Sequence, residues 1–190
     1  MNGNVYLVHP KRFGDSRGWF TEVYNEERFA EIGISCRFVQ DNHSMSAPVG
    51  TIRGLHFQTP PFAQAKLVRC VRGSIFDVAV DIRAGSPTNG QWVGAILSAE
   101  NGDQLFVPAG FAHGFVTLEP NTEVVYKVSA PYAPANDAGL LWNDEDIGVN
   151  WNLPDGVEPV LSDKDQRQPR LAEFESPFSC DGTPMRLIEV

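Results

Sequence analysis

The stretch Ile75-Phe76-Asp77-Val78-Ala79-Val80-Asp81-Ile82 alternates large apolar residues with small or acidic ones. Successive side chains of a β-strand point to opposite faces, so this alternation predicts a strand with two unlike faces. The apolar face, which begins at Phe76, is expected in the core. The face that carries Asp77 and Asp81 is expected to meet water or a pocket.

Segments of the same kind lie on both sides of this strand. The chain has 17 Gly and 14 Pro, and most segments between them are about five to eight residues long and alternate in the same way. This spacing is typical of an antiparallel β-sandwich or barrel. We therefore predict an all-β fold, a barrel or sandwich of jelly-roll type with short peripheral helices. The other expected strands span 19–24, 38–44, 53–58, 66–71, 92–98, 104–107, 113–118 and 122–128.

Two early segments lack this alternation. Residues 13–18 contain two glycines and a serine and are expected to form a turn-rich loop. Asn25 is expected to cap the one convincing helix, because asparagine is a preferred residue at the N-cap. Glu26 and Glu27 then occupy the first turn, where the helix dipole favours acidic side chains. This helix is short, so we expect it on the surface.

The length of 190 residues suits a single domain, residues 1–190. The barrel core is expected at about 38–130. The segment at about 131–190 is expected to pack on the barrel as loops and a short helix, with the last ten or so residues frayed. No apolar run is long enough to span a bilayer, and the N-terminus lacks a charged-then-apolar signal, so we expect a cytoplasmic protein with no membrane partner.

The charge of the chain restricts its ligands. The formal net charge is −9 and the pI is about 4.8, which argues against binding nucleic acid through a broad basic face. An anionic ligand must therefore be held by a local cluster of Arg and Lys. The three cysteines, Cys36, Cys70 and Cys180, are too few and too far apart for a disulfide framework or a zinc site.

The segment Arg53-Gly54-Leu55-His56-Phe57-Gln58 places a guanidinium, an imidazole and an amide within six residues. Its alternation predicts a strand with Leu55 and Phe57 on one face and the polar side chains on the other. If the polar face meets a pocket, His56 is a catalytic candidate. Taken alone, the segment favours a histidine on the wet face of a half-buried strand.

The turn Pro108-Ala109-Gly110-Phe111-Ala112-His113 resembles the second half of the signature of cupins, a superfamily of small jelly-roll barrels. Metal-binding cupins also carry His-x-His on an earlier strand, but here Gln58 follows His56 at that spacing. An iron or manganese ion bound in a cupin barrel needs several well-placed His and carboxylate ligands, so we predict a barrel without a metal. A histidine in such a barrel is best suited to proton transfer, and Tyr126 is an acid by type, although an ordinary strand aromatic is the simpler interpretation.

Nine motifs together resemble the dTDP-4-dehydrorhamnose 3,5-epimerase family, in that family's order from about residue 10 to residue 170. They are Phe13-Gly14-Asp15-x-Arg17-Gly18, Gln40-Asp41-Asn42-His43-Ser44, Arg53-Gly54-Leu55-His56-Phe57-Gln58, Lys66-Leu67-Val68-Arg69-Cys70, Gly90-Gln91-Trp92-Val93-Gly94, Pro108-x-Gly110-Phe111-Ala112-His113-Gly114-Phe115, Tyr126-Lys127, Leu141-Trp142-Asn143-Asp144 and Leu161-Ser162-x-Lys164-Asp165.

The resemblance implies an isomerase without cofactor or metal. The family inverts carbons 3 and 5 of dTDP-4-dehydro-6-deoxy-D-glucose to give dTDP-4-dehydro-β-L-rhamnose, in dTDP-L-rhamnose biosynthesis. The resemblance implies that His56 is the base, that Asp165 orients it, and that Tyr126 returns a proton from the other face. Lys66 would stabilise the enolate oxygen, where negative charge develops.

The resemblance also implies substrate-binding positions and a homodimer with sheet elements shared across the interface. Tyr132 would stack on the thymine ring, and Asp137 stands where a longer Glu is expected to contact the nucleotide. In a regular strand Arg53 and His56 would point apart, so their roles require a bulge or a strand end near Gly54. The full set of implied binding residues is Arg17, Glu22, Gln40, Asn42, Arg53, Lys66, His113, Tyr132, Asp137 and Lys164.

Three other functions stay open on the sequence. The first is a 3- or 5-epimerase of another dTDP-4-keto sugar, since one changed contact in the pocket can stop the second inversion. The second is a metal-dependent cupin enzyme. The third is a non-catalytic nucleotide-sugar binding module, because a fold never proves a reaction.

Overall fold

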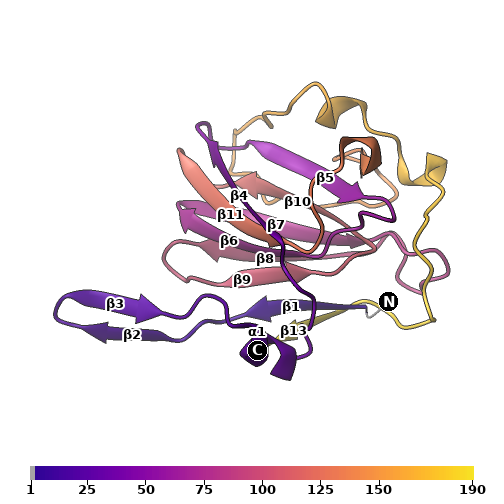
Figure 1. Cartoon of the computed structure of the whole chain (residues 1–190). Helices are drawn as coiled ribbons and strands as arrows, with labels where there is room; N and C mark the ends of the chain where they lie inside the picture. Colours follow the sequence, from indigo (N-terminus) through magenta and orange to yellow (C-terminus); the bar gives the residue numbers. More distant parts are fainter. Residues whose placement is uncertain (1–2) are drawn as a thin grey trace.

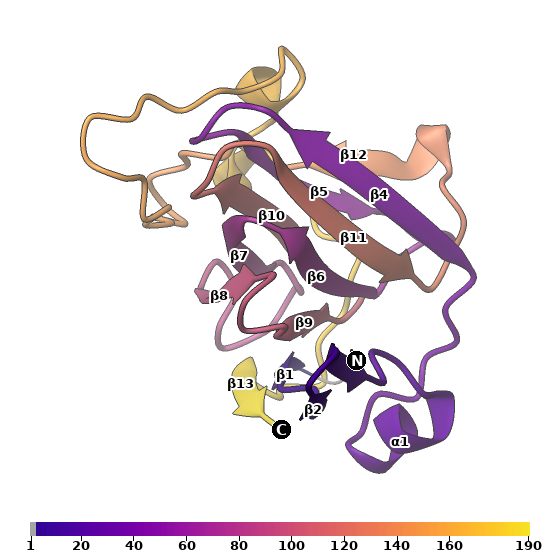
Figure 2. The same ribbon diagram turned by 90° about the vertical axis from the view of Figure 1, so that its left-hand side faces the viewer.

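The computed structural model describes residues 3–190 and places most strands in two sheets that face each other (Figures 1 and 2). Both sheets are antiparallel except where β13 pairs with β1 in parallel. One sheet has the order β13 (Arg186–Glu189), β1 (Asn4–Val8), β9 (Gln104–Val107), β6 (Lys66–Arg72), β11 (Thr122–Val128), β4 (Gln40–Ser46). The other has the order β12 (Asp137–Gly139), β5 (Ile52–Gln58), β10 (Phe111–Thr117), β7 (Ser74–Asp81), β8 (Trp92–Ser98). This architecture confirms the predicted all-β jelly roll.

The remaining elements are short. The strands β2 (Arg12–Asp15) and β3 (Gly18–Thr21) form a separate hairpin, and α1 spans Glu26–Glu31. Three 3₁₀ helices lie between β11 and β13 in the sequence: η1 (Pro134–Asn136), η2 (Asp165–Arg167) and η3 (Leu171–Glu173). No helix within residues 3–190 is long and apolar enough to cross a membrane.

The strand β7 shows how the core is divided. Its apolar row, with Phe76 and Val78, packs on the outer side of its sheet under the C-terminal segment. Its other row lies between the two sheets, where Asp77 and Asp81 are both 0% exposed. Of the two expected environments, water or a pocket, water is therefore wrong for both carboxylates. Asp81 is instead neutralised by Arg83, which is also fully buried, because a charge in the interior requires a partner.

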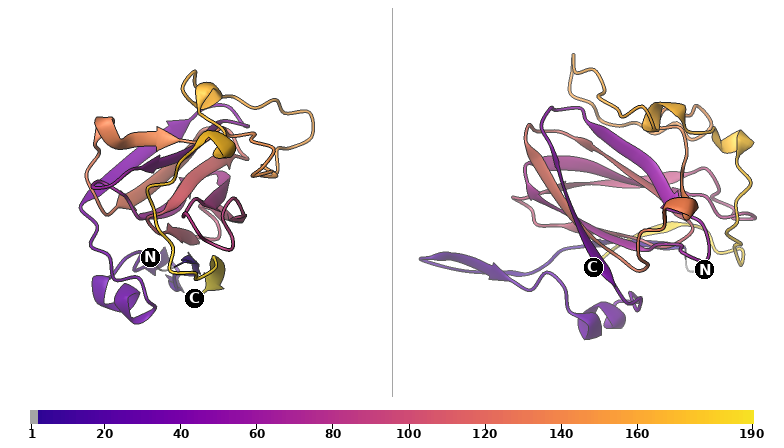
Figure 3. Two further views of the ribbon diagram at one scale, coloured as in Figure 1. Left: turned by 90° about the vertical axis from the view of Figure 1, so that its right-hand side faces the viewer. Right: turned by 45° about the horizontal axis from the view of Figure 1, so that its top comes forward.

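The predicted helix and the predicted loop near the N-terminus have different outcomes. Asn25 caps α1 as expected, since its side chain accepts hydrogen bonds from two backbone N–H groups of the first turn. The loop predicted at 13–18 is wrong, because β2 and β3 pair across it and project away from the sheets (Figures 1 and 3). Phe13, Trp19 and Phe20 on this hairpin are 53%, 59% and 70% exposed.

The strand β5 contains the bulge that the positions of Arg53 and His56 require. His113 of β10 pairs with His56, and Phe115 pairs with Arg53, so β5 has one residue more than β10 between these pairs. Gly54 lies in the bulge with φ of +152°, and a Cβ there would be 2.6 Å from the Cα of Gly114. Only glycine fits this close approach. The bulge turns the side chains of Arg53 and His56 to the same side of the sheet.

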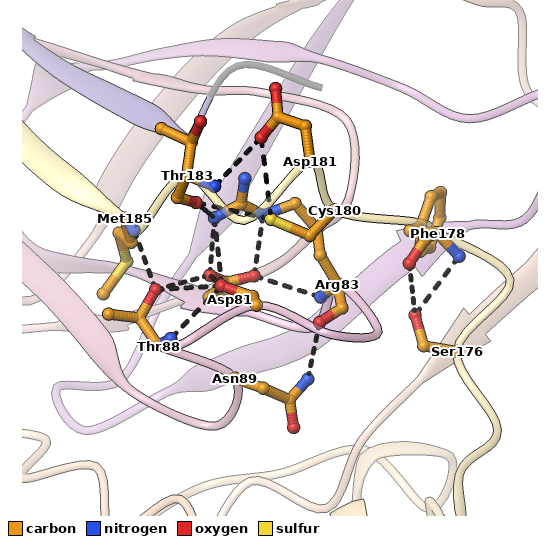
Figure 4. A network of polar contacts seen from close by, with 11 residues as sticks. Asp81, Arg83, Thr88, Asn89, Ser176, Phe178, Cys180, Asp181, Thr183 and Met185 are labelled. Atoms are coloured by element: carbon orange, nitrogen blue, oxygen red, sulfur yellow. Dashed lines mark hydrogen bonds and ion pairs between the residues drawn. The ribbon is translucent and has the colours of Figure 1, made fainter.

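The C-terminal segment crosses the outer side of the five-stranded sheet and ends as β13 beside β1 (Figure 3). The prediction of a frayed end is therefore wrong over β13. The buried pair of Asp81 and Arg83 holds this segment in place (Figure 4). Arg83 Nη2 lies 2.7 Å from Asp81 Oδ2 and donates to the Thr183 carbonyl at 3.1 Å, while Ser86 and Thr88 donate to the same carboxylate oxygen at 2.6 and 2.7 Å.

The change Asp81→Asn is expected to destabilise the fold by about 3 to 5 kcal/mol, because it leaves the buried Arg83 guanidinium without its counter-charge. Urea unfolding at neutral pH, followed by tryptophan fluorescence, measures this loss. A change below about 1 kcal/mol would show that the pair contributes little to stability.

Candidate active site

Two pockets lie between the sheets and share four lining residues, so we describe them as the large and the small lobe of one cavity. The large lobe has a volume of about 400 Å³ and the small lobe about 220 Å³. Residues of both sheets line each lobe, so the jelly roll itself forms the walls. Four side chains border both lobes: His56 from β5, Lys66 from β6, Tyr126 from β11 and Lys164 from the segment before η2.

His56 is held by Asp165, although 109 residues separate them in the sequence. The ring Nε2 lies 2.5 Å from Asp165 Oδ1. Burial raises the pKa of Asp165, but the hydrogen bond and charge of His56 outweigh it and leave the pKa below its ordinary value. The carboxylate can only accept, so Nε2 carries the proton and Nδ1 is the basic nitrogen. Asp163, by contrast, lies on the surface with a side chain 87% exposed.

Lys66 is a buried cation, 8% exposed, at the junction of the lobes. Its Nζ donates to the His56 carbonyl at 3.2 Å. Burial lowers the pKa of Lys66 to about 8, against the opposing charges of Asp77 and Asp137. The side chain is therefore largely charged at neutral pH and has donors left for a ligand in the cavity.

Tyr126 borders the cavity from the sheet opposite to His56, since β11 and β5 belong to different sheets. Burial raises the pKa of its hydroxyl, while Arg53 acts in the opposite direction. The phenol is therefore protonated at neutral pH. An imidazole and a protonated phenol thus face the same cavity from its two walls.

Polar side chains order the small lobe. Gln40 donates to Asn42 Oδ1 at 2.8 Å and accepts from the backbone N–H of Tyr132 at 3.1 Å. Asp137 Oδ2 accepts from Lys164 Nζ at 2.5 Å and from the Tyr132 hydroxyl at 3.2 Å. Tyr132 remains open to solvent, with 58% of the residue exposed.

Arg53 brings a further cation to the large lobe. Its Nε donates to Ser46 Oγ at 3.1 Å and its Nη2 to the Met45 carbonyl at 3.2 Å, which ties the guanidinium to β4. Together with Lys66 and Lys164, it makes the cavity suited to an anion although the whole chain is acidic.

The structure does not bring Arg17 and Glu22 to this cavity. Arg17 sits at the turn of the β2–β3 hairpin, where it pairs with Asp15 at 2.6 Å and its side chain is 88% exposed. Glu22 follows the hairpin and pairs with Arg28 at 3.1 Å. Neither residue lines either lobe within this chain.

Gln58 and His113 have structural partners. The Gln58 amide donates to the carbonyls of Phe62 and Pro131 and accepts from the N–H of Ala133, so it holds two loops beside the small lobe. His113 lines the large lobe, and its Nε2 lies 2.8 Å from Asp77 Oδ1. Within residues 3–190, no group of three or more His, Cys, Asp or Glu side chains is placed to hold a metal ion.

Two residues of this environment were not predicted as part of the site. Ser162 lines the large lobe and accepts from the backbone N–H of Asp165 at 3.1 Å. Asp77 lies behind His113. The alternation of β7 placed Asp77 on a face expected to meet water or a pocket, but it did not show that His113 is the partner of Asp77.

The fold is a jelly roll of the cupin type, and its cavity brings a histidine–aspartate pair, a buried lysine and a tyrosine together. The family model described as dTDP-4-dehydrorhamnose 3,5-epimerase matches residues 3–173. The chain belongs to this family of sugar epimerases.

Individual relatives agree with this assignment. A dTDP-4-dehydrorhamnose 3,5-epimerase of Sinorhizobium fredii is 57% identical over 174 residues, which cover 92% of this chain and 88% of the relative. The crystal structure of the Bacillus anthracis enzyme with TDP and PPi bound is 52% identical, with a TM-score of 0.83 over 86% of this chain and 92% of that chain. The Legionella pneumophila enzyme in complex with dTDP-4-keto-L-rhamnose is 44% identical, with a TM-score of 0.84 over 89% and 88%.

Proposed function

We propose that this chain catalyses the 3,5-epimerisation of dTDP-4-dehydro-6-deoxy-D-glucose to dTDP-4-dehydro-β-L-rhamnose. The observation that carries the proposal is the placement of His56, oriented by Asp165, across one cavity from Tyr126. Inversion of a carbon requires removal of a proton from one face and its return on the other. Family membership and the dTDP-sugar held by the Legionella pneumophila relative support this substrate.

The same two-step chemistry serves both carbons, because C3 and C5 each adjoin the C4 ketone. Nδ1 of His56 takes the proton, and the electrons of the broken C–H bond form the C=C bond of an enolate with its charge on O4. The ammonium of Lys66 stabilises this charge, which develops only during the reaction. Tyr126 then gives its proton to the opposite face of the carbon. Proton exchange with water restores neutral His56 and the Tyr126 phenol.

The small lobe is proposed to hold the thymidine. The cations of the cavity are proposed to hold the pyrophosphate. The exposed ring of Tyr132 is free to stack on a base. Arg53 suits a pyrophosphate, since a planar guanidinium binds phosphate oxygens in pairs. Asp137 is already paired with Lys164, so its proposed role is to position that lysine. Gln40, Asn42 and His113 are proposed to complete the contacts to the substrate.

A homodimer is proposed to complete the site. The projecting β2–β3 hairpin (Figure 1) has three exposed aromatic side chains. Its residue Arg17 lines neither lobe of its own chain. In a dimer the hairpin of one protomer would reach the cavity of its partner, where Arg17 would add to the phosphate contacts and Glu22 would contact another part of the substrate.

Subunit complementation tests the shared site. Heterodimers of Arg17→Ala and His56→Asn chains, separated by two different affinity tags, should recover about half of the wild-type activity, because one of the two sites then has all its residues. If Arg17 serves its own chain, both sites lack a residue and the heterodimer stays inactive. Sedimentation of the wild type as a monomer would also contradict the dimer.

Reaction in D₂O tests the function. The enzyme is incubated with dTDP-4-dehydro-6-deoxyglucose, and the product is examined by NMR and mass spectrometry. Deuterium at both C3 and C5 is expected. Deuterium at one carbon would indicate a mono-epimerase, and none would indicate a binding module. A parallel reaction in EDTA is expected to keep full activity, whereas a metal-dependent enzyme would lose it.

The change Tyr126→Phe is expected to separate the two proton transfers. His56 and Lys66 remain, so washout of the C3 proton into D₂O continues. Correct reprotonation loses its acid, and the yield of doubly inverted product falls by about 10² or more. NMR of exchange and product in the same tube measures both. An unchanged product yield would show that Tyr126 is not the acid.

A further inference from the structure

Gln58 is a buried side chain at the end of β5, with 3% of the residue exposed. Its two amide donors and its carbonyl oxygen each have a backbone partner. Nε2 donates to the Phe62 carbonyl at 2.7 Å and to the Pro131 carbonyl at 3.1 Å. Oε1 accepts from the Ala133 N–H at 2.8 Å. The reverse orientation would set Oε1 against two carbonyls and Nε2 against an N–H, so these partners fix the amide.

The contacts of Gln58 flank Tyr132, because Pro131 precedes this tyrosine and Ala133 follows it. The N–H of Tyr132 itself donates to Gln40 Oε1 at 3.1 Å. Gln40 is the first residue of β4 in the six-stranded sheet, and Gln58 is the last residue of β5 in the five-stranded sheet. Three consecutive backbone positions are therefore held by side chains from both sheets.

The ring of Tyr132 is also attached, although 58% of the residue is exposed. Its hydroxyl donates to Asp137 Oδ2 at 3.2 Å, and Asp137 is the partner of Gln58 where β12 pairs with β5. Both ends of the Tyr132 side chain are thus fastened beside β5. A ring that is already held in place loses little conformational freedom when a ligand stacks on it. The exposed ring is therefore a preorganised surface for a flat, aromatic ligand.

The strand β5 also carries the imidazole of the site. His56 and Gln58 are separated by one residue, and both line the small lobe. His56 lines the large lobe as well. One strand thus carries the imidazole and holds the backbone beside Tyr132. The distance between the two ends of a bound substrate is set by this strand.

We propose that Gln58 is a positioning residue for the nucleobase: it holds the backbone on both sides of Tyr132, so that the ring is preset to stack on the base. The inference rests on the proposed function, in which Tyr132 stacks on thymine while His56 acts on the sugar. Gln58 acts through the ring, because its own amide is engaged by the protein.

The affinity of Gln58→Met for two ligands tests this role. Methionine has a similar length but no amide, so the backbone beside Tyr132 loses its support. The Kd for dTDP is expected to rise about tenfold, the size of effect that loss of one stacked base can have. Pyrophosphate has no base, so its Kd is expected to stay within about twofold. Calorimetric titration measures both values. An unchanged Kd for dTDP, or equal losses for the two ligands, would overturn the proposal.

Steady-state kinetics of the same variant separate positioning from chemistry. KM for dTDP-4-dehydro-6-deoxyglucose is expected to rise about tenfold with kcat within about twofold, the pattern of lost uniform binding. A fall of kcat in Gln58→Met with an unchanged KM would contradict the inference. A wild type that binds dTDP but does not epimerise its substrate would refute the proposed reaction, while the binding measurements still decide the role of Gln58.

A double-mutant cycle shows whether Gln58 acts through Tyr132. Tyr132→Ala alone is expected to weaken dTDP binding about tenfold. Adding Gln58→Met to it is expected to cost less than about twofold more, because the ring that Gln58 positions is already gone. Losses that multiply to about a hundredfold would overturn the inference alone. Wild-type affinity in Tyr132→Ala would remove the stacking from the proposed function, and the inference would fall with it.

Gln104→Met is the matched control for loss of a buried glutamine. Gln104 on β9 is 2% exposed, and its Nε2 donates to the Val23 carbonyl at 2.7 Å. It lines neither lobe. This variant is expected to unfold at a lower temperature and to keep the wild-type ratio of the Kd values for dTDP and pyrophosphate. A change of this ratio as large as that in Gln58→Met would overturn the proposal.

Gln58→Glu covers the case in which Gln58→Met does not fold. Burial raises the pKa of a carboxylic acid at this position, and the neutral acid keeps an acceptor for the Ala133 N–H and one donor for a carbonyl. The Kd for dTDP is expected between those of the wild type and Tyr132→Ala. Exchange of the Ala133 amide, followed by NMR without ligand, is expected to be faster than in the wild type. Wild-type values of both would overturn the proposal.

Discussion

The change His56→Asn is expected to abolish turnover, with kcat lowered by at least about 10³, while the affinity for dTDP stays within about twofold of the wild type. His56 supplies a basic nitrogen at the cavity, because the buried carboxylate of Asp165 orients its ring through the 2.5 Å contact. Asparagine preserves much of the shape but cannot take a proton. The proposed nucleotide contacts in the small lobe come from other side chains, so binding is expected to survive.

Stopped assays of epimer formation and calorimetric titration with dTDP measure the two quantities. His9→Asn is the control, because His9 pairs with Asp103 at 2.9 Å on the surface, with its side chain 46% exposed. It should behave as the wild type. Retention of most of the activity in His56→Asn would make the assignment of the base wrong, and a loss of dTDP affinity in proportion to kcat would indicate a role in binding.

The change Lys66→Met is expected to lower kcat by about 10² to 10³, because removal of one preorganised donor from a developing oxyanion has this cost. The same change is expected to leave stability at neutral pH unchanged or higher. Burial lowers the pKa of Lys66 from 10.5 to about 8, so the folded state disfavours the charged form relative to the unfolded chain. That penalty is present below pH 8 and disappears as the pH rises toward 10.5.

Opposite effects on activity and stability are the signature of a buried catalytic cation. Lys66→Arg is the matched variant. The kcat/KM of the wild type is expected to fall as the pH rises through about 8, where Lys66 loses its proton. Arginine keeps its charge in this pH range, so the residual kcat/KM of Lys66→Arg should lack this fall. Lys66→Met with wild-type kcat would remove Lys66 from the mechanism. A large loss of stability in Lys66→Met would show instead that the ammonium is a structural partner.

The regular strands were predictable because local alternation decides them. The bounds expected at 92–98, 104–107 and 122–128 coincide with β8, β9 and β11. Strands with partners far away in the sequence were missed. The last strand, β13, pairs with β1 at the other end of the chain. The hairpin of β2 and β3 was missed because its glycines resemble those of a loop.

The sequence by itself determined the residue types of the site, the all-β class and the family, because alternation and motif order are properties of neighbours along the chain. Only the tertiary structure decided which side chains meet. The bulge at Gly54 turns Arg53 and His56 to one side, and Asp165 reaches His56 across 109 residues. The direction of a side chain depends on strand register, and its charge state depends on burial. Both are set by segments distant in the sequence.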